Sequence, residues 1–218
     1  MSTYYTVMVS LLTKLFYFVI ATSKKYEIDE THGLRHSMDI LRFTHDMFQH
    51  ELPMNSLLAE HERLIYVSAI IHDMCDKKYM NEDEGIEQIE DFLKDKLCKD
   101  EIYATKKIIS TMSYSKVKKV GFPDLGRYQH AYNIVREADL LTAYDFERCM
   151  MYNIHQQNGN IVEAFDSANT LFENRVFKHK EDGLLLTDYA RMKADSLHLD
   201  AANRINTWKS LIKHPSLL

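Results

Sequence analysis

Residues that break regular structure are scarce in this chain. Its 218 residues include only 6 glycines and 3 prolines, too few for the many tight turns of a β-sandwich or β-barrel. Long helices joined by short connections need fewer such residues. Apolar residues make up 45% of the chain and charged residues 27%, which is typical of an ordinary soluble globular protein. We therefore predict an all-α helical bundle that forms a single domain.

The spacing of apolar residues also favours helices. Leu34, Met38, Leu41 and Phe48 recur at intervals that place them on one face of a helix. Residues 113–126, which contain two glycines and a proline, form the longest predicted loop. Helices are expected at about residues 34–50, 59–73, 82–93, 99–112, 128–152, 161–178 and 187–212.

The N-terminal stretch, residues 4–22, is apolar enough to consider as a membrane segment. However, Lys14 interrupts it and no basic side chain precedes it, so it lacks the pattern of a signal peptide or a membrane span. We expect residues 1–25 to form a helix packed on the domain rather than a membrane span, and contact of this helix with a membrane surface is left open. Residues 26–150 are assigned to the core, and residues 151–218 to C-terminal helices that complete the same domain.

Charge and cysteine content limit the location and the partners. The formal net charge of −5 provides no general attraction for nucleic acid, so no nucleic-acid partner is expected. The three cysteines are widely spaced and form no C-x-x-C pair, which suits a reducing compartment and a cytoplasmic location. Assembly with further copies of the chain, as a homo-oligomer, is left open.

The pair His72 and Asp73 closes an apolar run at residues 64–71. Aspartate is almost never buried without a partner, because an unpaired buried carboxylate is costly. A divalent metal accepts an imidazole and a carboxylate together. Two further ligands are available in His36, near the start of its helix, and Asp139, which apolar residues flank. We predict a metal site formed by His36, His72, Asp73 and Asp139.

This ligand set leaves the identity of the metal open. Two imidazoles and two carboxylates suit Mn²⁺, Fe²⁺, Zn²⁺ or Mg²⁺, with coordination positions left for water and a substrate oxygen. Taken alone, Asp139 could instead be an ion-pair partner of Arg136 or Arg148.

The order His36, His72-Asp73, Asp139 resembles the metal-binding signature of the HD-domain phosphohydrolase superfamily. Residues 32–36 (HGLRH) resemble its opening motif, residues 69–73 (AIIHD) its apolar helix leading into the HD pair, and residues 138–143 (ADLLTA) its closing motif. Residues 76–79 (DKKY) and 171–175 (LFENR) resemble a branch of stand-alone HD hydrolases. The resemblance covers about residues 26–191.

The resemblance implies a metal-dependent enzyme that uses metal-activated water to cleave a phosphomonoester or pyrophosphate bond. Its substrate would be a nucleotide or a related small phosphate ester. A bound cation can lower the pKa of coordinated water from about 15.7 to about 7 and polarise a phosphoryl oxygen. In the superfamily, sites with several metals use additional histidines before the last aspartate. Here only His130 lies in that interval, which favours one divalent metal ion.

Two other functions are left open. The first is a catalytically weak HD domain that senses a nucleotide or a metal without turnover. The second is a purely structural role, in which a metal or an internal ion pair ties helices together.

Further residues are assigned to catalysis. Asp76 follows His72 by four residues and Asp73 by three, so on a continued helix the three side chains share one face. Asp76 is therefore predicted to be the general base or proton shuttle, beside Asp73 at the metal.

Basic side chains near the HD pair are predicted to bind substrate phosphate. Lys77 and Lys78 lie closest to it in sequence, and His32 and Arg35 precede the ligand His36. A second basic cluster in the predicted loop comprises Lys116, Lys118 and Lys119.

Overall fold

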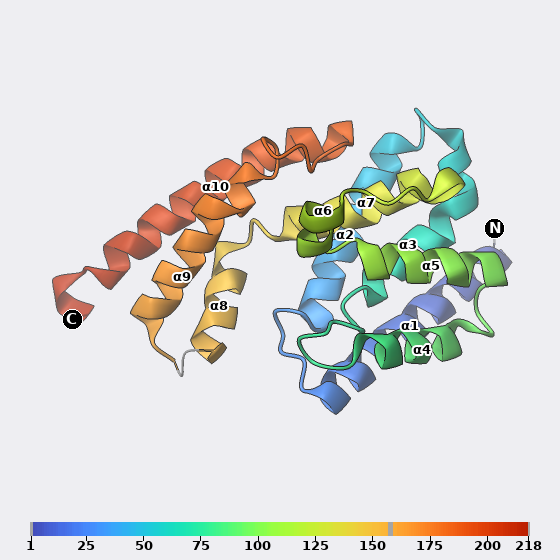
Figure 1. Cartoon of the computed structure of the whole chain (residues 1–218), viewed down its shortest axis with the longest axis horizontal. Coiled ribbons are helices and arrows are strands. Elements are labelled where there is room, and N and C mark those ends of the chain that lie inside the picture. Colours follow the sequence, from blue (N-terminus) through green and yellow to red (C-terminus); the bar gives the residue numbers. More distant parts are fainter. Residues whose placement is uncertain (1, 157–158, 218) are drawn as a thin grey trace. The chain divides into compact units, whose positions relative to one another are not determined.

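The computed structural model describes residues 2–156 and 159–217. In these ranges the chain forms ten α-helices and four short 3₁₀ helices, with no β-strand (Figure 1). The predicted all-α fold is confirmed. The α-helices are α1 (Ser2–Tyr26), α2 (Leu34–Glu51), α3 (Glu62–Ile71), α4 (Glu82–Leu93), α5 (Lys99–Thr111), α6 (Tyr114–Val120), α7 (Gln129–Thr142), α8 (Phe146–Gln156), α9 (Ile161–Asn174) and α10 (Asp188–Ile212).

The chain divides into two compact units, Met1–Ala138 and Asp139–Leu218. The first unit contains α1 to α6 and most of α7, and the second contains the end of α7 and α8 to α10. The division falls inside α7, immediately before Asp139. The assignment of residues 151–218 to the same domain as the core stays a prediction.

Helix α3 is the central element of the first unit and packs against α1, α2 and α5. Its apolar residues Leu64, Ile65, Ile70 and Ile71 are completely buried. A helix that is apolar around most of its circumference must be surrounded by other elements. The end of α3, which His72 and Asp73 follow, is therefore fixed within the core.

The N-terminal helix α1 contributes to the same core. Leu15 and Val19 are buried in a cluster with Ile70 and Ile71 of α3 and Ile89 of α4. Among the described residues, no helix combines the length and the hydropathy needed to cross a membrane.

The prediction of a loop over residues 113–126 was wrong in its first half, where the chain forms helix α6. The Ser113 hydroxyl accepts a hydrogen bond from the Lys116 backbone N–H at 3.4 Å, so it caps the start of this helix. Val117 is buried and anchors the helix to the core. A good cap and one apolar anchor are sufficient for a two-turn helix beside a packed surface.

The predicted helix at residues 128–152 is interrupted after Thr142, and α8 begins at Phe146. Asp145 accepts a hydrogen bond from the Arg148 backbone N–H at 3.1 Å, which is the pattern of an N-cap. Helix α3 also differs, because it ends at Ile71 rather than at Asp73. The following residues form a tight turn, in which Met74 N–H donates to the Ile71 carbonyl at 2.9 Å.

In the second unit, aromatic residues connect α8 and α9. Phe146 contacts Phe165 and Phe172 edge to face, with ring centroids 5.7 and 5.2 Å away. Helix α10 begins where Thr187 caps it by accepting a hydrogen bond from Ala190 N–H. Its alanines at positions 190, 194 and 201 are buried, so this helix packs with small side chains on its inner face.

Helix α4 approaches the turn after α3 at Gly85. A Cβ atom at this position would lie 2.7 Å from both Cα and Cβ of Cys75, closer than carbon atoms can pack. The absence of a side chain at Gly85 therefore allows α4 to pack closely against the turn that contains His72 and Asp73.

We expect Gly85→Ala to destabilise the protein by about 1–3 kcal/mol, because the added methyl group overpacks this contact. At an open position in a helix the same change would stabilise by up to about 1 kcal/mol, so the sign of the effect is diagnostic. Urea unfolding followed by circular dichroism measures it, with the exposed Glu87→Ala on the same helix as control. A rise in the unfolding midpoint of Gly85→Ala would contradict the close contact.

Candidate metal centre

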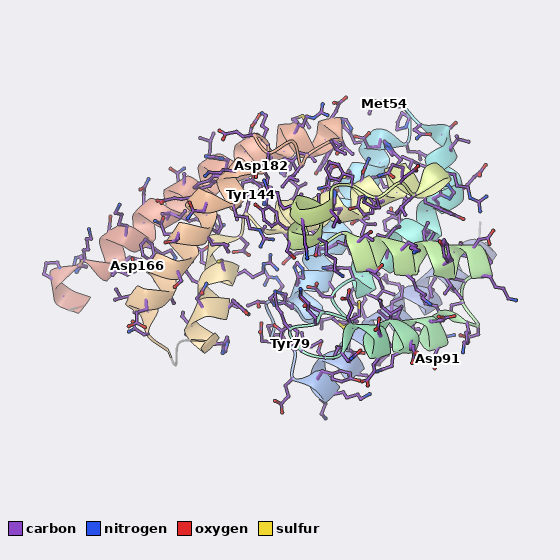
Figure 2. All side chains as sticks on the ribbon, viewed as in Figure 1. Met54, Tyr79, Asp91, Tyr144, Asp166 and Asp182 are labelled. Atoms are coloured by element: carbon purple, nitrogen blue, oxygen red, sulfur yellow. The ribbon has the colours of Figure 1, made fainter. Side chains whose placement is uncertain are left out.

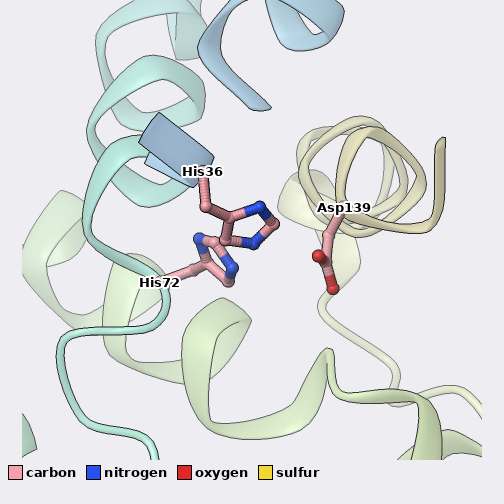
Figure 3. A group of neighbouring side chains, drawn as sticks. All are labelled: His36, His72 and Asp139. Atoms are coloured by element: carbon pink, nitrogen blue, oxygen red, sulfur yellow. The ribbon is translucent and has the colours of Figure 1, made fainter. Parts of the chain in front are cut away.

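Two imidazoles and one carboxylate from distant parts of the sequence converge at the end of α3. His36 lies in the first turn of α2 and is 1% exposed, and His72 follows the last residue of α3 and is 6% exposed. Asp139 lies in α7. One ligand atom from each of the three side chains lies within 4.8 Å of the other two, and the side chains point toward one another (Figure 3).

The position of Asp139 is set by helix α7. Asp139 is the first residue of the second unit, but the ten residues of α7 before it belong to the first unit. Ala138 and Leu140 on either side are buried, so the helix is held firmly at this point. The carboxylate therefore stands beside the imidazoles as part of a continuous helix.

Asp73 contacts both imidazoles through different oxygens. Its Oδ2 lies 3.3 Å from Nε2 of His36, and its Oδ1 lies 3.1 Å from Nε2 of His72. Oδ2 is buried and accepts no hydrogen bond of normal geometry from the described residues. His36, His72 and Asp139 thus lie close together, and Asp73 contacts both histidines; their role as metal ligands stays a prediction.

The hydrogen bond of His72 to the backbone determines which ring nitrogen carries a proton. Its Nδ1 lies 2.9 Å from the carbonyl oxygen of Ala69, which can only accept, so Nδ1 is the donor. In the neutral ring, Nε2 then carries a lone pair directed at Asp73 Oδ1. Two acceptors 3.1 Å apart repel each other unless a proton or a cation lies between them.

The charge of Asp73 follows from the same contacts. Burial raises the pKa of its carboxyl group, but the positive charge of a protonated His72 and hydrogen bonds from His36 and His72 outweigh this effect, and the net pKa lies well below the usual value. Asp73 is therefore an anion at neutral pH, and its negative charge lies in the centre of the group.

This group of side chains fits a divalent cation. Carboxylate oxygens are hard ligands and imidazole nitrogens are borderline ones, a combination that binds Mn²⁺, Fe²⁺, Zn²⁺ or Mg²⁺. The Ala69 carbonyl orients His72 in the way that outer groups commonly orient metal-binding histidines. His130, the additional histidine considered from the sequence, lies 3.5 Å from Glu51 and takes part in a different contact.

Asp76 is in the turn region rather than on a continued helix, because α3 ends at Ile71. The expectation that Asp76 shares a helix face with His72 and Asp73 was therefore wrong. Its carboxylate instead accepts a hydrogen bond from the Lys78 backbone N–H at 2.9 Å and lies 3.6 Å from the Lys78 ammonium. The role of Asp76 as a general base stays a prediction.

The predicted phosphate-binding residues have different surroundings. Lys78 and His32 contact each other, with 3.1 Å between Nζ and Nε2, and the His32 and His36 ring centroids are 6.1 Å apart. Lys77 is exposed. Arg35 is also exposed and pairs with Asp39 one turn along α2 at 3.0 Å. In the second basic cluster, Lys116 pairs with Glu82 and donates to the Ser110 carbonyl.

Three residues next to His32 were not assigned to the site from the sequence. Tyr79, in the connection between α3 and α4 (Figure 2), donates its hydroxyl proton to Asp29 at 2.7 Å and lies 3.0 Å from His32 Nδ1. Thr31 makes the corresponding contacts, to Asp29 and to the same ring nitrogen at 2.9 Å. Burial raises the pKa of Asp29, but hydrogen bonds from His32, Thr31 and Tyr79, in that order of effect, outweigh it and bring the pKa well below the usual value.

No protein-family model and no curated protein matches this chain. Among solved structures, it is similar to a Lactobacillus plantarum protein whose crystal structure was a Northeast Structural Genomics target, with a TM-score of 0.65. The match covers 92% of this chain and 96% of that chain, at 19% sequence identity. At this identity the similarity supports the all-helical fold alone.

We expect the protein to bind one equivalent of Mn²⁺ or Zn²⁺. His36→Ala and Asp139→Ala should each weaken this binding at least about tenfold. Mutating a residue that only hydrogen-bonds to a metal ligand already has an effect of about this size, and each of these changes removes a ligand itself. Elemental analysis after equilibrium dialysis measures bound metal, and His155→Ala, an exposed histidine on α8, is the control. Wild-type protein that retains neither metal would instead support an internal ion pair.

Asp29→Asn should lower the free energy of unfolding by about 1.5–3 kcal/mol at neutral pH, the usual value of hydrogen bonds to a charged group. The pKa of Asp29 in the folded protein lies below the usual 3.8. Its stabilisation is therefore complete above that pH and is lost as the pH falls toward the folded-state value. Urea titrations should show wild type and variant converging below about pH 4, whereas the exposed Asp166→Asn should match wild type throughout.

Proposed function

We propose that this chain is a metal-dependent phosphohydrolase of the HD superfamily, acting on a nucleotide or a related small phosphate ester. The observation that carries the proposal is that His36, His72 and Asp139 converge from three distant segments, with Asp73 in contact with both histidines. A stable helical bundle has no need of two buried imidazoles beside two partly buried carboxylates, because each costs solvation energy.

The four side chains would hold one divalent cation, which supplies a water nucleophile at neutral pH and polarises the phosphoryl oxygen. The chain's own contribution is to prepare the ligands. The Ala69 carbonyl keeps the Nε2 lone pair of His72 directed into the site, and Asp73 stays ionised between the imidazoles. Burial of both histidines limits competing water and strengthens the electrostatic interactions inside.

Groups for substrate and proton transfer lie in the segment directly after the ligand pair. Lys78 presents an ammonium group that is half exposed, with a side-chain exposure of 47%. Lysine commonly binds phosphate as a point charge. Asp76 is an ionisable carboxylate outside the ligand group, with 21% exposure. It is suited to accept a proton from the attacking water, provided that it lies within hydrogen-bond reach of it.

The protein should release phosphate or pyrophosphate from at least one member of a nucleotide panel when Mn²⁺ is added. His72→Ala and Asp139→Ala should reduce the rate by at least about 10³-fold, because the nucleophile depends on the bound ion. A malachite-green assay with a pyrophosphatase arm measures release. The exposed His155→Ala and Asp166→Ala serve as matched controls, and circular dichroism verifies folding.

Other outcomes would favour the alternative functions. Stoichiometric metal without release from any nucleotide would support a sensor domain. Unfolding of the whole protein on addition of a chelator, with no turnover when metal is present, would support a structural metal site.

A further inference from the structure

A continuous chain of polar contacts leads from Asp29 to Lys78 beside the metal centre. Tyr79 and Thr31 both donate their hydroxyl protons to Asp29. Both hydroxyl oxygens also lie close to Nδ1 of His32, at 3.0 and 2.9 Å. On the other side of the ring, Nε2 of His32 lies 3.1 Å from the Lys78 ammonium.

The hydrogen-bond chemistry of these groups allows one arrangement of protons. Asp29 is ionised and only accepts, so the two hydroxyl groups use their protons on it. Their oxygens then act as acceptors toward His32, and Nδ1 must carry the proton. An ammonium group only donates, so Nε2 of His32 must be the acceptor for Lys78. In this arrangement Nδ1 of His32 donates toward the hydroxyl oxygens and Nε2 accepts from Lys78.

This arrangement restricts where Lys78 can lie. A lysine side chain has several rotatable bonds and loses considerable entropy when it is fixed. Here the ammonium group of Lys78 contacts two partners. It donates to Nε2 of His32 at 3.1 Å, and the carboxylate of Asp76 lies 3.6 Å from Nζ. His32 is itself next to the metal ligand His36, with ring centroids 6.1 Å apart. The ammonium is thus connected to the ligand His36 through one intervening ring, that of His32, before any substrate arrives.

We infer that Asp29, Thr31 and Tyr79 are positioning residues that act through His32 to hold Lys78 as the phosphate-binding group of this site. The inference rests on the proposed function for the chemistry of the ligand, a phosphate group. Asp29 and Tyr79 are fifty positions apart in the sequence, and their contact joins the turn before α2 to the segment after the HD pair. Preorganising one charged donor in this way lowers the entropic cost of binding.

The test is calorimetric titration of Mn²⁺-loaded protein with inorganic pyrophosphate in the presence of excess Mn²⁺. Lys78→Met should raise the dissociation constant about tenfold or more, since a charge-assisted hydrogen bond is lost. Tyr79→Phe removes only the hydroxyl and should raise it about fivefold, the effect of one net hydrogen bond. His32→Gln, whose amide oxygen can accept from Lys78 in place of Nε2, should bind more tightly than His32→Ala.

Two matched controls remove the same groups elsewhere. Lys99→Met and Tyr103→Phe change exposed side chains on α5 and should bind pyrophosphate like wild type. Bound Mn²⁺, measured by elemental analysis, should be unchanged in every variant. Wild-type affinity in Tyr79→Phe, or loss of Mn²⁺ in parallel with loss of pyrophosphate binding, would overturn the inference.

The failures of the two proposals are distinguishable. Pyrophosphate binding that depends on Lys78 and Tyr79, without hydrolysis of any nucleotide, would refute the hydrolase and support the positioning chain. Hydrolysis with a KM unchanged in Tyr79→Phe would support the hydrolase and refute the positioning chain. Metal-loaded protein that binds no pyrophosphate would also refute it.

Discussion

The site depends on the contact between the imidazole of His72 and the carboxylate of Asp73 at the end of α3. The carbonyl of Ala69 accepts the Nδ1 proton of His72, so the lone pair of the neutral ring is directed at the carboxylate of Asp73, 3.1 Å away. Buried groups that repel each other in this way are costly, and a positive charge between them removes the cost. The local backbone geometry therefore favours a positive charge at this point, either a proton on Nε2 of His72 or a bound cation, and His36 and Asp139 supply ligand atoms close to His72.

His72 and Asp73 stay this close only if the surrounding structure is rigid. Helix α3 is enclosed by α1, α2 and α5, and α4 packs on the following turn at Gly85. The turn cannot relax by separating the two side chains without disturbing these contacts, because protein interiors are packed as densely as crystals. The hydrophobic core therefore contributes to the chemistry of the site as well as to the stability of the fold.

The sequence was sufficient to predict the all-α fold and to select His36, His72 and Asp139, whose side chains lie close together. Helical periodicity and the scarcity of glycine and proline report on local structure, and the ligands lie at recognisable positions in it. Helix α6 and the break after Thr142 were not predicted, since they depend on the caps Ser113 and Asp145. Short polar side chains of this kind occur equally in loops, so the caps become evident only in the structure.

The contact between Asp29 and Tyr79 could not be predicted from the sequence for a different reason. No periodicity links residues that are fifty positions apart and lie in irregular segments, and each alone is an ordinary polar residue. The expectation for Asp76 was wrong for a related reason, because it assumed that α3 continues beyond Ile71. The end of a helix is harder to predict from a sequence than its presence.

Because Gly85 packs closely against Cys75, the reactivity of the Cys75 thiol depends on whether α4 covers the turn. Cys75 is 3% exposed, and burial, together with the negative charge of Asp73, raises the pKa of its thiol to about 12. A thiol of this kind resists alkylation while α4 stays in place. Its rate of modification therefore measures how often the segment next to the ligand pair opens to solvent.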